Sequence, residues 1–244
     1  MKISDNTILI TGGGSGIGLA LAKAFAMRGN VVIVCGRNAK KLEAVRTKNP
    51  AIDTFRCDIA SDQDQQRLVE YISQKYLNLN VLINNAGIQH NYDFSDHKNH
   101  TGLIEEEVNI NFLAHLKLTD RFLPLLMKHS SAAIVNVTSA LALVPKQSAP
   151  IYCATKAAMH NFTKALRYQL EDTTVKVFEI IPALVDTDMT QGRGKRKITP
   201  EALATETLRG IESNTYEIRI EKTKLLFMLN RLLPAVAEKI IRNG

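Results

Sequence analysis

The chain has few cysteines and no long apolar run. Its three cysteines, Cys35, Cys57 and Cys153, lie far apart in 244 residues, and no C-x-x-C pair occurs. An odd number of dispersed cysteines favours reduced thiols in a cytoplasmic protein and argues against a structural zinc site. No apolar stretch approaches the roughly 20 residues needed to span a bilayer, and no apolar targeting segment precedes the first strand-like run. We therefore expect neither a membrane span nor a secretory signal.

Histidines are gathered in one place but not in a pattern that binds metal. His90, His97 and His100 lie in a polar stretch, and we expect this stretch to be a loop. Their spacings of seven and three residues match no common template for a metal site, which requires three or four ligands held at fixed intervals. We therefore expect no bound metal ion.

The charge is unbalanced toward basic residues, with a formal net charge of +7. Such a charge suits either nucleic acid or a phosphorylated small molecule. The basic residues are scattered except at 193–197, which we interpret as a solvated loop, with an anion-binding patch as the alternative. A nucleic-acid-binding protein would show strongly salt-dependent binding to duplex DNA. The scattered charge favours a protein without a nucleic-acid partner.

Short apolar runs alternate with segments of helical periodicity along the chain. The runs predict strands at 7–11, 31–35, 53–57, 81–84, 133–137 and 175–181. Helices are predicted at about 17–25, 39–48, 61–76, 103–128 (bent before Pro124) and 152–170, and another starts at Thr199-Pro200. This alternation is typical of a mostly parallel sheet with helices on both faces. The sequence predicts an α/β fold: one doubly wound, Rossmann-type domain over 1–244, with a cofactor half of about 1–140 and a catalytic and substrate half of about 141–244.

A glycine-rich turn follows the first strand and precedes the first helix. It reads Thr11-Gly-Gly-Gly-Ser-Gly-Ile-Gly18, a Gly-x-x-x-Gly-x-Gly spacing. Glycines let the backbone approach a ligand closely, and the N–H groups at a helix N-terminus bind phosphates. A tight connection without a ligand is the alternative, but the position favours dinucleotide binding. The candidate cofactor-binding residues here are Gly12, Gly14, Ser15, Gly16, Ile17 and Gly18.

The end of the second strand lacks an acidic residue. Folds that prefer NAD carry an acid there to bind the ribose 2′-hydroxyl, whereas an arginine accommodates a 2′-phosphate. No acidic residue occurs between Val31 and Lys41, and Arg37, Lys40 and Lys41 are basic. We therefore expect Arg37 to favour NADP(H), with NAD(H) as the alternative, unless Arg37 is merely solvated.

A tyrosine and a lysine are four residues apart in Tyr152-Cys-Ala-Thr-Lys156. On a helix this spacing puts both side chains on one face. A nearby cation favours the ionised form of a phenol, whose ordinary pKa is about 10, so the tyrosine becomes a candidate acid or base. The pair alone is weak evidence, because an ordinary helix with a half-buried tyrosine has the same pattern. Ser139, after the fifth strand, is a candidate donor to a substrate carbonyl or simply the cap of a turn.

These motifs together resemble those of the classical short-chain dehydrogenase/reductases. The resemblance covers about 1–190 and includes the glycine turn, Asn84-Asn85-Ala86-Gly87, Ser139 and Tyr152-x-x-x-Lys156, in order and at matching spacing. The stretch 136–140 and the apolar segment 225–228 are also similar to bacterial oxidoreductases of the DltE-like subgroup. The resemblance implies a seven-stranded sheet, an NAD(P) cofactor and a small carbonyl or alcohol substrate.

The resemblance also implies a role for each matching residue. Tyr152 would be the general acid, Lys156 would lower the tyrosine pKa and bind the nicotinamide ribose, and Ser139 would hold the substrate oxygen. Asn111 would support a water-linked proton relay, with Asn109 as a competing candidate. Ala114 stands where the family has a glycine after this asparagine, a mild departure.

Further cofactor contacts are implied at three strand ends. Asp58 and Ile59 would lie beside the adenine, and Pro182, Val185 and Thr187 would contact the carboxamide and phosphates, with Ala183 in place of the usual glycine. The small residues Asn85, Ala86 and Gly87 would let the cofactor pass over the fourth strand. The expected function is hydride transfer between NADP(H) and a carbonyl or alcohol.

Two matters stay open at the level of sequence. A non-catalytic dinucleotide-binding regulator is the alternative function, although such proteins often lose the tyrosine or the lysine. The apolar segment 225–234 fits a core helix, a subunit contact or a membrane-surface helix, in that order. The resemblance implies a homo-oligomer, a dimer or tetramer that uses the helices near 103–128 and 152–170 as contact surfaces.

Overall fold

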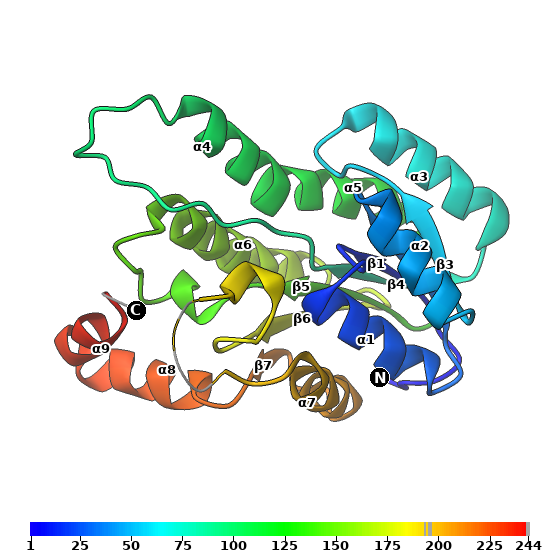
Figure 1. The fold of residues 1–244 in the computed structure, drawn as a ribbon. Helices are drawn as coiled ribbons and strands as arrows, with labels where there is room; N and C mark the ends of the chain where they lie inside the picture. The colour runs from blue at the N-terminus through cyan, green and yellow to red at the C-terminus, as the bar shows by residue number, and fades with distance from the viewer. Residues whose placement is uncertain (193, 195–196, 243–244) are drawn as a thin grey trace.

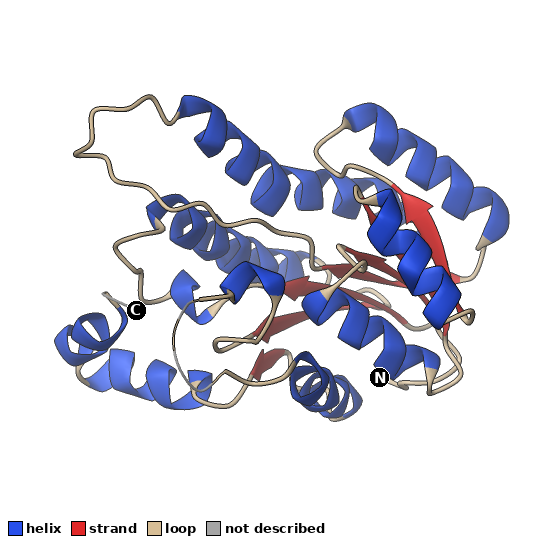
Figure 2. Ribbon diagram, viewed as in Figure 1, coloured by secondary structure: helices blue, strands red, loops and turns tan. Residues whose placement is uncertain are grey.

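A seven-stranded sheet forms the centre of the structure (Figures 1 and 2). The computed structural model describes residues 1–192, 194 and 197–242, so Arg193, Lys195 and Arg196 of the basic stretch lie outside the described residues. The strand order is β3-β2-β1-β4-β5-β6-β7, and every pair of neighbours is parallel. The strands are β1 (Thr7–Thr11), β2 (Val31–Gly36), β3 (Ile52–Arg56), β4 (Leu79–Asn84), β5 (Ala132–Val137), β6 (Val175–Ile181) and β7 (Glu217–Arg219).

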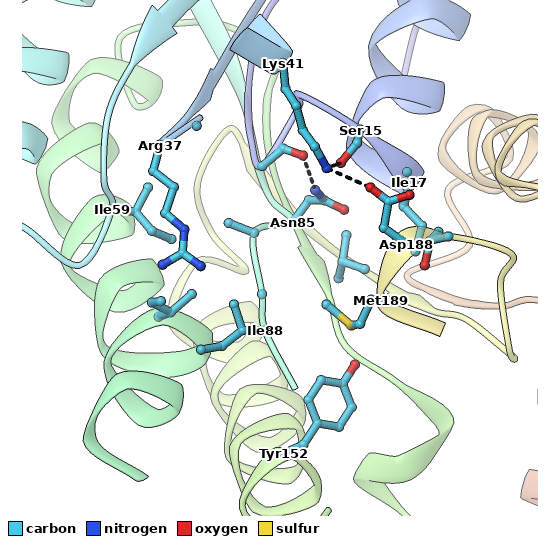
Figure 3. A pocket seen from close by; sticks show the side chains of 18 of the residues that line it. Ser15, Ile17, Arg37, Lys41, Ile59, Asn85, Ile88, Tyr152, Asp188 and Met189 are labelled. Carbon is cyan, nitrogen blue, oxygen red and sulfur yellow. Dashed lines mark hydrogen bonds and ion pairs between the residues drawn. The ribbon is translucent and has the colours of Figure 1, made fainter. Parts of the chain in front are cut away.

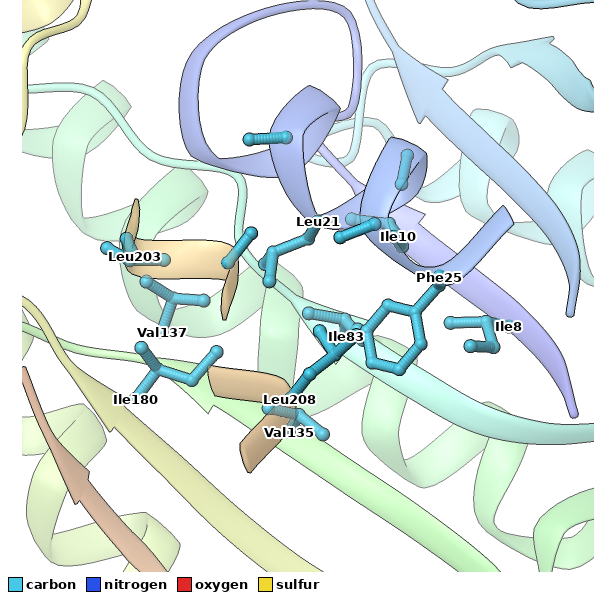
Figure 4. Close-up of a cluster of buried hydrophobic side chains, with 14 of the residues drawn as sticks. Ile8, Ile10, Leu21, Phe25, Ile83, Val135, Val137, Ile180, Leu203 and Leu208 are labelled. Carbon is cyan, nitrogen blue, oxygen red and sulfur yellow. The ribbon is translucent and has the colours of Figure 1, made fainter. Parts of the chain in front are cut away.

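Helices cover both faces of the sheet because successive strand residues point to opposite sides. In β1, Ile8 and Ile10 belong to one buried cluster and Leu9 to another. The first cluster packs under α1 (Gly16–Ala26), α2 (Ala39–Lys48) and α7 (Pro200–Glu212), and Figure 4 shows Phe25, Leu203 and Leu208 of its helices against the strands. The second packs under α3 (Asp62–Lys75), α5 (Ala114–Leu126) and α6 (Pro150–Gln169). The predicted doubly wound fold is confirmed.

Capping residues, proline and periodicity in the sequence predict the positions of most helices and strands correctly. Ser61 and Thr199 cap α3 and α7, accepting hydrogen bonds from the backbone N–H groups of Asp64 and Ala202. The helix α6 begins two residues before Tyr152, with Pro150 at its first position, where its missing N–H is no loss. Periodicity does not reveal β7, because three residues are too few for an alternating pattern.

The long helix expected at 103–128 is built from three pieces. They are α4 (Thr101–Val108), a π-helix (Asn109–Leu113) and α5, and α5 continues through Pro124. The irregularity at Asn109–Leu113 was not expected, because the only bend predicted from the sequence was the one before Pro124. A π-turn leaves no mark on composition, and π-helical insertions are frequent at functional sites. Here the π-helix carries Asn111.

The C-terminal apolar segment forms two surface helices, α8 (Thr223–Leu232) and α9 (Pro234–Ile241). Thr223 and Ala237 are their buried residues, whereas Leu225, Met228 and Leu232 are all more than half exposed. The expectation of a core helix was therefore wrong. In the part of the chain that the structure describes, no helix is both long enough and apolar enough to cross a membrane.

Two short 3₁₀ helices complete the carboxyl side of the sheet. One spans Ala140–Ala142 after β5, and the other spans Asp188–Thr190 after β6. The first begins three residues after the end of β5 and the second seven residues after the end of β6, at the edge of the sheet where the glycine turn also lies. The three cysteines are free and buried.

Candidate active site

A cleft of about 360 Å³ opens at the carboxyl edge of the sheet. It lies where the strand order reverses, because β1 has β2 on one side and β4 on the other. In doubly wound folds this reversal leaves a crevice between the connections that follow the two strands, and ligands bind there. The predicted cofactor and catalytic residues that line it are Gly12, Ser15, Gly16, Ile17, Arg37, Asp58, Ile59, Asn85, Ala86, Gly87, Tyr152, Lys156, Pro182 and Thr187.

The glycine turn fits tightly against the segment that follows β4. Gly12 has a φ of +68°, a conformation that side chains disfavour, and a Cβ on it would lie 2.8 Å from the Cα of Ala86. The Thr11 hydroxyl oxygen accepts hydrogen bonds from the N–H groups of Asn85 (2.9 Å) and Ala86 (3.0 Å). In return the Asn85 amide donates to the carbonyl oxygen of Thr11 at 2.8 Å. The two strand ends are therefore fixed to each other at the base of the cleft.

Gly18 lies behind the turn rather than in the cleft. A Cβ on Gly18 would lie 2.5 Å from both the Gly12 carbonyl oxygen and the Asn85 Nδ2 atom, so the turn would have to move. Gly14 is also outside the lining, with its α-carbon facing Lys41. These two predicted residues shape the turn without lining the cleft.

Replacing Gly18 with alanine is expected to destabilise the protein by about 1–3 kcal/mol, the usual cost of overpacking. Gly102, in α4, has no atom within 4 Å of an added Cβ. Its replacement by alanine should instead stabilise the protein, because alanine is favoured over glycine inside helices by roughly 0.5–1 kcal/mol. Urea unfolding of both variants measures the two effects. Equal stabilities would contradict the packing described for the turn.

Two basic side chains line the cleft at the end of β2 and the start of α2, and each is paired with a carboxylate. Arg37 Nη1 lies 3.2 Å from Glu106 Oε1 of α4. Lys41 Nζ lies 2.7 Å from Asp188 Oδ2 and 3.5 Å from the Ser15 hydroxyl oxygen (Figure 3). Arg37 therefore has a charged partner, which differs from the alternative in which it is merely solvated. Acids distant in sequence supply the negative charge that β2 lacks.

Tyr152 and Lys156 enter the cleft from the first turns of α6. Figure 3 shows the Tyr152 hydroxyl pointing into the cleft toward Met189. The Lys156 ammonium is buried, lies 5.7 Å from the centre of the Tyr152 ring and donates to the Val137 carbonyl oxygen at 2.8 Å. Burial lowers the pKa of Lys156 to about 8, although the charges of Glu107 and Glu179 act in the opposite direction. Lys156 thus loses its proton more readily than an exposed lysine does.

Asn111 and Ser139 are not among the residues that line the cleft. Asn111 is fully buried: its Oδ1 accepts from Ile88 N at 2.8 Å, and its Nδ2 donates to the Ile88 carbonyl oxygen and to Thr155 Oγ1. The rival Asn109 is exposed. Ser139 Oγ accepts from Leu141 N at 3.1 Å and so caps the 3₁₀ helix after β5.

The segment after β6 lies across the cleft from α2. Thr187 begins the 3₁₀ helix Asp188–Thr190 and lines the cleft with Asp188 and Met189. Val185 is outside the lining and buried, bridged to Ile198. Sequence reasoning missed Ile88, Asp188, Met189 and Glu106. Ile88, Asp188 and Met189 directly follow predicted residues, whereas Glu106 contacts Arg37 across 69 residues of sequence, which no local signal reveals.

The cleft fits an extended, phosphorylated dinucleotide. The turn at Gly12 leaves no room for a Cβ, and the N-terminus of α1 opens into the cleft beside Ser15, so backbone N–H groups are available to a diphosphate. Across the described residues, no three His, Cys, Asp or Glu side chains are grouped to hold a metal ion. The strand order and this cleft define a doubly wound α/β protein of the Rossmann class.

Residues 6–198 match the family model for short chain dehydrogenases. The chain belongs to this family of oxidoreductases. It is 43% identical over 230 residues to the oxidoreductase DltE of Bacillus subtilis (strain 168), a match that covers 92% of this chain and 91% of that protein. The resemblance to the DltE-like subgroup is confirmed.

Solved structures of related proteins share the fold. A short chain dehydrogenase from Burkholderia cenocepacia J2315, in complex with NADP, has a TM-score of 0.87 at 23% identity, covering 100% of both chains. The 3-ketoacyl-(acyl-carrier-protein) reductase from Brucella melitensis, complexed with NADH, has a TM-score of 0.80 at 26% identity. That match covers 86% of this chain and 91% of the reductase. Proteins of this fold therefore bind either cofactor.

Proposed function

We propose that the protein transfers a hydride between NADP(H) and a small carbonyl or alcohol substrate, with Tyr152 as the general acid and base. The observation that carries the proposal is the Tyr152 hydroxyl directed into a cleft that also contains the buried cation Lys156 and the glycine turn. A bound nicotinamide cofactor supplies or accepts the hydride, and the protein supplies orientation and the proton.

Each polar group beside Tyr152 has a defined task in this proposal. In reduction the Tyr152 hydroxyl donates its proton to the carbonyl oxygen, and in oxidation the phenolate takes it from the alcohol. The Lys156 ammonium favours the phenolate by its charge, which brings the tyrosine closer to its working pH. Because Ser139 Oγ accepts the Leu141 N–H, its own hydrogen is available to a substrate oxygen. Ser139 then holds that oxygen beside Tyr152.

Asn111 keeps the floor of the site in place. Its side chain joins the Ile88 backbone to Thr155 of α6, one residue before Lys156. A Cβ on Gly87 would lie 3.3 Å from Asn111 Oδ1 and 3.8 Å from Lys156 Nζ, so both polar atoms border the space beside Gly87. This placement supports a role for Asn111 in proton supply to Lys156.

Arg37 supports NADP(H) as the preferred cofactor, with NAD(H) as the alternative. Its guanidinium lines the cleft at the end of β2, where a ribose 2′-phosphate would find a planar, bidentate cation. Lys41 adds a second positive charge on the same side of the cleft. Asp58 and Ile59 border the same region and suit the adenine.

The proposal is tested by a turnover assay with NADPH and with NADH against a panel of aldehydes and ketones, and with NADP⁺ and NAD⁺ against alcohols. We expect turnover of at least one substrate, faster with the 2′-phosphorylated cofactor. Tight cofactor binding without any turnover would favour a dinucleotide-binding regulator. A preference of tenfold or more for NADH would contradict the role given to Arg37.

We further propose that residues 1–244 act as one cytoplasmic domain and assemble into a dimer or tetramer. The helices expected at the subunit contacts carry exposed apolar side chains: Leu103, Leu113, Met127 and Tyr168 are between 40% and 73% exposed. A second subunit packed against these helices would remove such side chains from water. Light scattering after size exclusion measures the mass of the assembly.

A further inference from the structure

The carboxylate of Glu106 lies beside Arg37, the residue expected to meet the ribose 2′ position of the cofactor, although Glu106 itself is outside the cleft lining. Arg37 Nη1 is 3.2 Å from Glu106 Oε1, and His90 Nε2 is 3.0 Å from Glu106 Oε2. Arg37 lines the cleft at the end of β2, whereas Glu106 comes from α4, 69 residues later. One carboxylate therefore bridges the arginine and a histidine of the loop after β4.

The neighbouring contacts hold Glu106 in this position. The next residue, Glu107, is buried and accepts hydrogen bonds from the Tyr92 hydroxyl (2.7 Å) and from His90 N (3.4 Å). These bonds tie the loop after β4 to α4. Burial alone would raise the pKa of Glu106, but hydrogen bonds from Arg37 and His90 outweigh it and lower the pKa. Glu106 is therefore ionised at neutral pH.

An ionised carboxylate beside Arg37 affects the two cofactors in opposite ways. A 2′-phosphate must compete with Glu106 for the guanidinium, and it meets a like charge at close range. A 2′-hydroxyl instead finds a hydrogen-bond acceptor, the function that an acidic residue at the end of the second strand performs in NAD-preferring folds. In this chain the acceptor would come from α4, where no sequence motif points to it.

We propose that Glu106 sets the cofactor selectivity of the cleft, reducing the advantage that Arg37 gives to NADP(H) and allowing NAD(H) to bind. This inference rests on the proposed cofactor-dependent function. The pair is about half exposed, with 57% of the Arg37 side chain and 39% of the Glu106 side chain accessible. Solvent screens such a pair, so its effect on affinity is moderate. Glu106 is thus a residue that tunes the choice of cofactor.

The test compares Glu106→Gln with Glu105→Gln, a matched change at the adjacent, exposed position of α4. Dissociation constants for NADPH and NADH are measured by cofactor fluorescence titration at low ionic strength. In Glu106→Gln we expect NADPH to bind more tightly and NADH more weakly. The ratio of the two constants should shift about tenfold toward NADPH, or about 1.4 kcal/mol. Glu105→Gln should leave the ratio unchanged.

A second variant separates selectivity from a structural role. In Arg37→Ala, the further change Glu106→Gln should shift the ratio less, because the competition for the guanidinium is gone and only the like-charge repulsion and the hydrogen bond to the 2′-hydroxyl remain. An equal change in both dissociation constants in Glu106→Gln would overturn the inference and leave the proposed function standing. If neither cofactor bound the unaltered protein, the proposed function would fail, and the inference with it.

Discussion

Replacing Tyr152 with phenylalanine should lower turnover by about 10²–10⁴-fold, the usual contribution of a general acid or base. The change removes only the hydroxyl that points into the cleft, so the ring and its position over Lys156 should persist. We therefore expect the dissociation constant of the cofactor to change by less than about twofold, since this variant should lose a proton transfer rather than a binding contact. Steady-state rates and fluorescence titration on the same preparation separate the two quantities.

Tyr168 offers a matched control on the same helix. It lies near the end of α6, is 73% exposed and is outside the cleft lining. Tyr168→Phe removes the same hydroxyl from the same kind of residue and should leave turnover unchanged. Full activity in Tyr152→Phe would contradict the assignment of Tyr152 as the general acid, whatever the result for Tyr168→Phe.

Replacing Lys156 with methionine should abolish turnover and, in the cofactor-free protein, raise stability at pH 7. Burial holds the pKa of Lys156 near 8 in the folded protein, against an ordinary value of 10.5. The unfolded chain therefore binds more protons between pH 8 and 10.5, and the lysine's contribution to stability rises with pH through this window. Below pH 8 the buried charge costs roughly 3 kcal/mol, at 1.36 kcal/mol for each unit of pKa.

The net effect of Lys156→Met on the free energy of unfolding is smaller than this cost and changes sign with pH. Losing the hydrogen bond to the Val137 carbonyl oxygen costs about 1 kcal/mol, so we expect a gain of about 2 kcal/mol at pH 7. The gain should shrink as pH rises above 8 and reverse at about pH 10, where the remaining cost of the buried charge equals the value of the hydrogen bond. Urea unfolding at several pH values measures this gain in stability.

Lys164→Met, on the same helix at a site with 39% exposure, should show no such pH-dependent gain. A pH-independent difference for Lys156→Met would contradict the buried charge.

Parts of the site that rest on contiguous residues could be predicted from the sequence. The strand, glycine turn and helix of 7–26 follow each other directly, and the Tyr152–Lys156 spacing fixes one face of one helix. Both motifs therefore carry their geometry locally. The strand order is needed only to know where these local pieces meet, which is at the reversal between β1 and β4.

Contacts between distant segments could not be predicted in the same way. The absence of an acid after β2 indicated a cationic pocket, but folding brings Glu106 to Arg37 and Asp188 to Lys41. No sequence pattern within a few residues of Glu106 or Asp188 predicts these ion pairs. The strand β7 and the π-helix were missed for a different reason, since three and five residues are shorter than the window that reveals a period.

The π-helix also changes how positions along α4 and α5 relate to each other. A turn that closes one residue later than an α-turn shifts the phase of all following side chains by roughly 100°, the rotation per residue of an α-helix. A helical wheel drawn continuously over 101–126 is therefore out of phase beyond Leu113. Glu106 precedes the π-helix and Asn111 lies within it, whereas Leu118 and Phe122 of α5 follow it and belong to the buried cluster against the sheet.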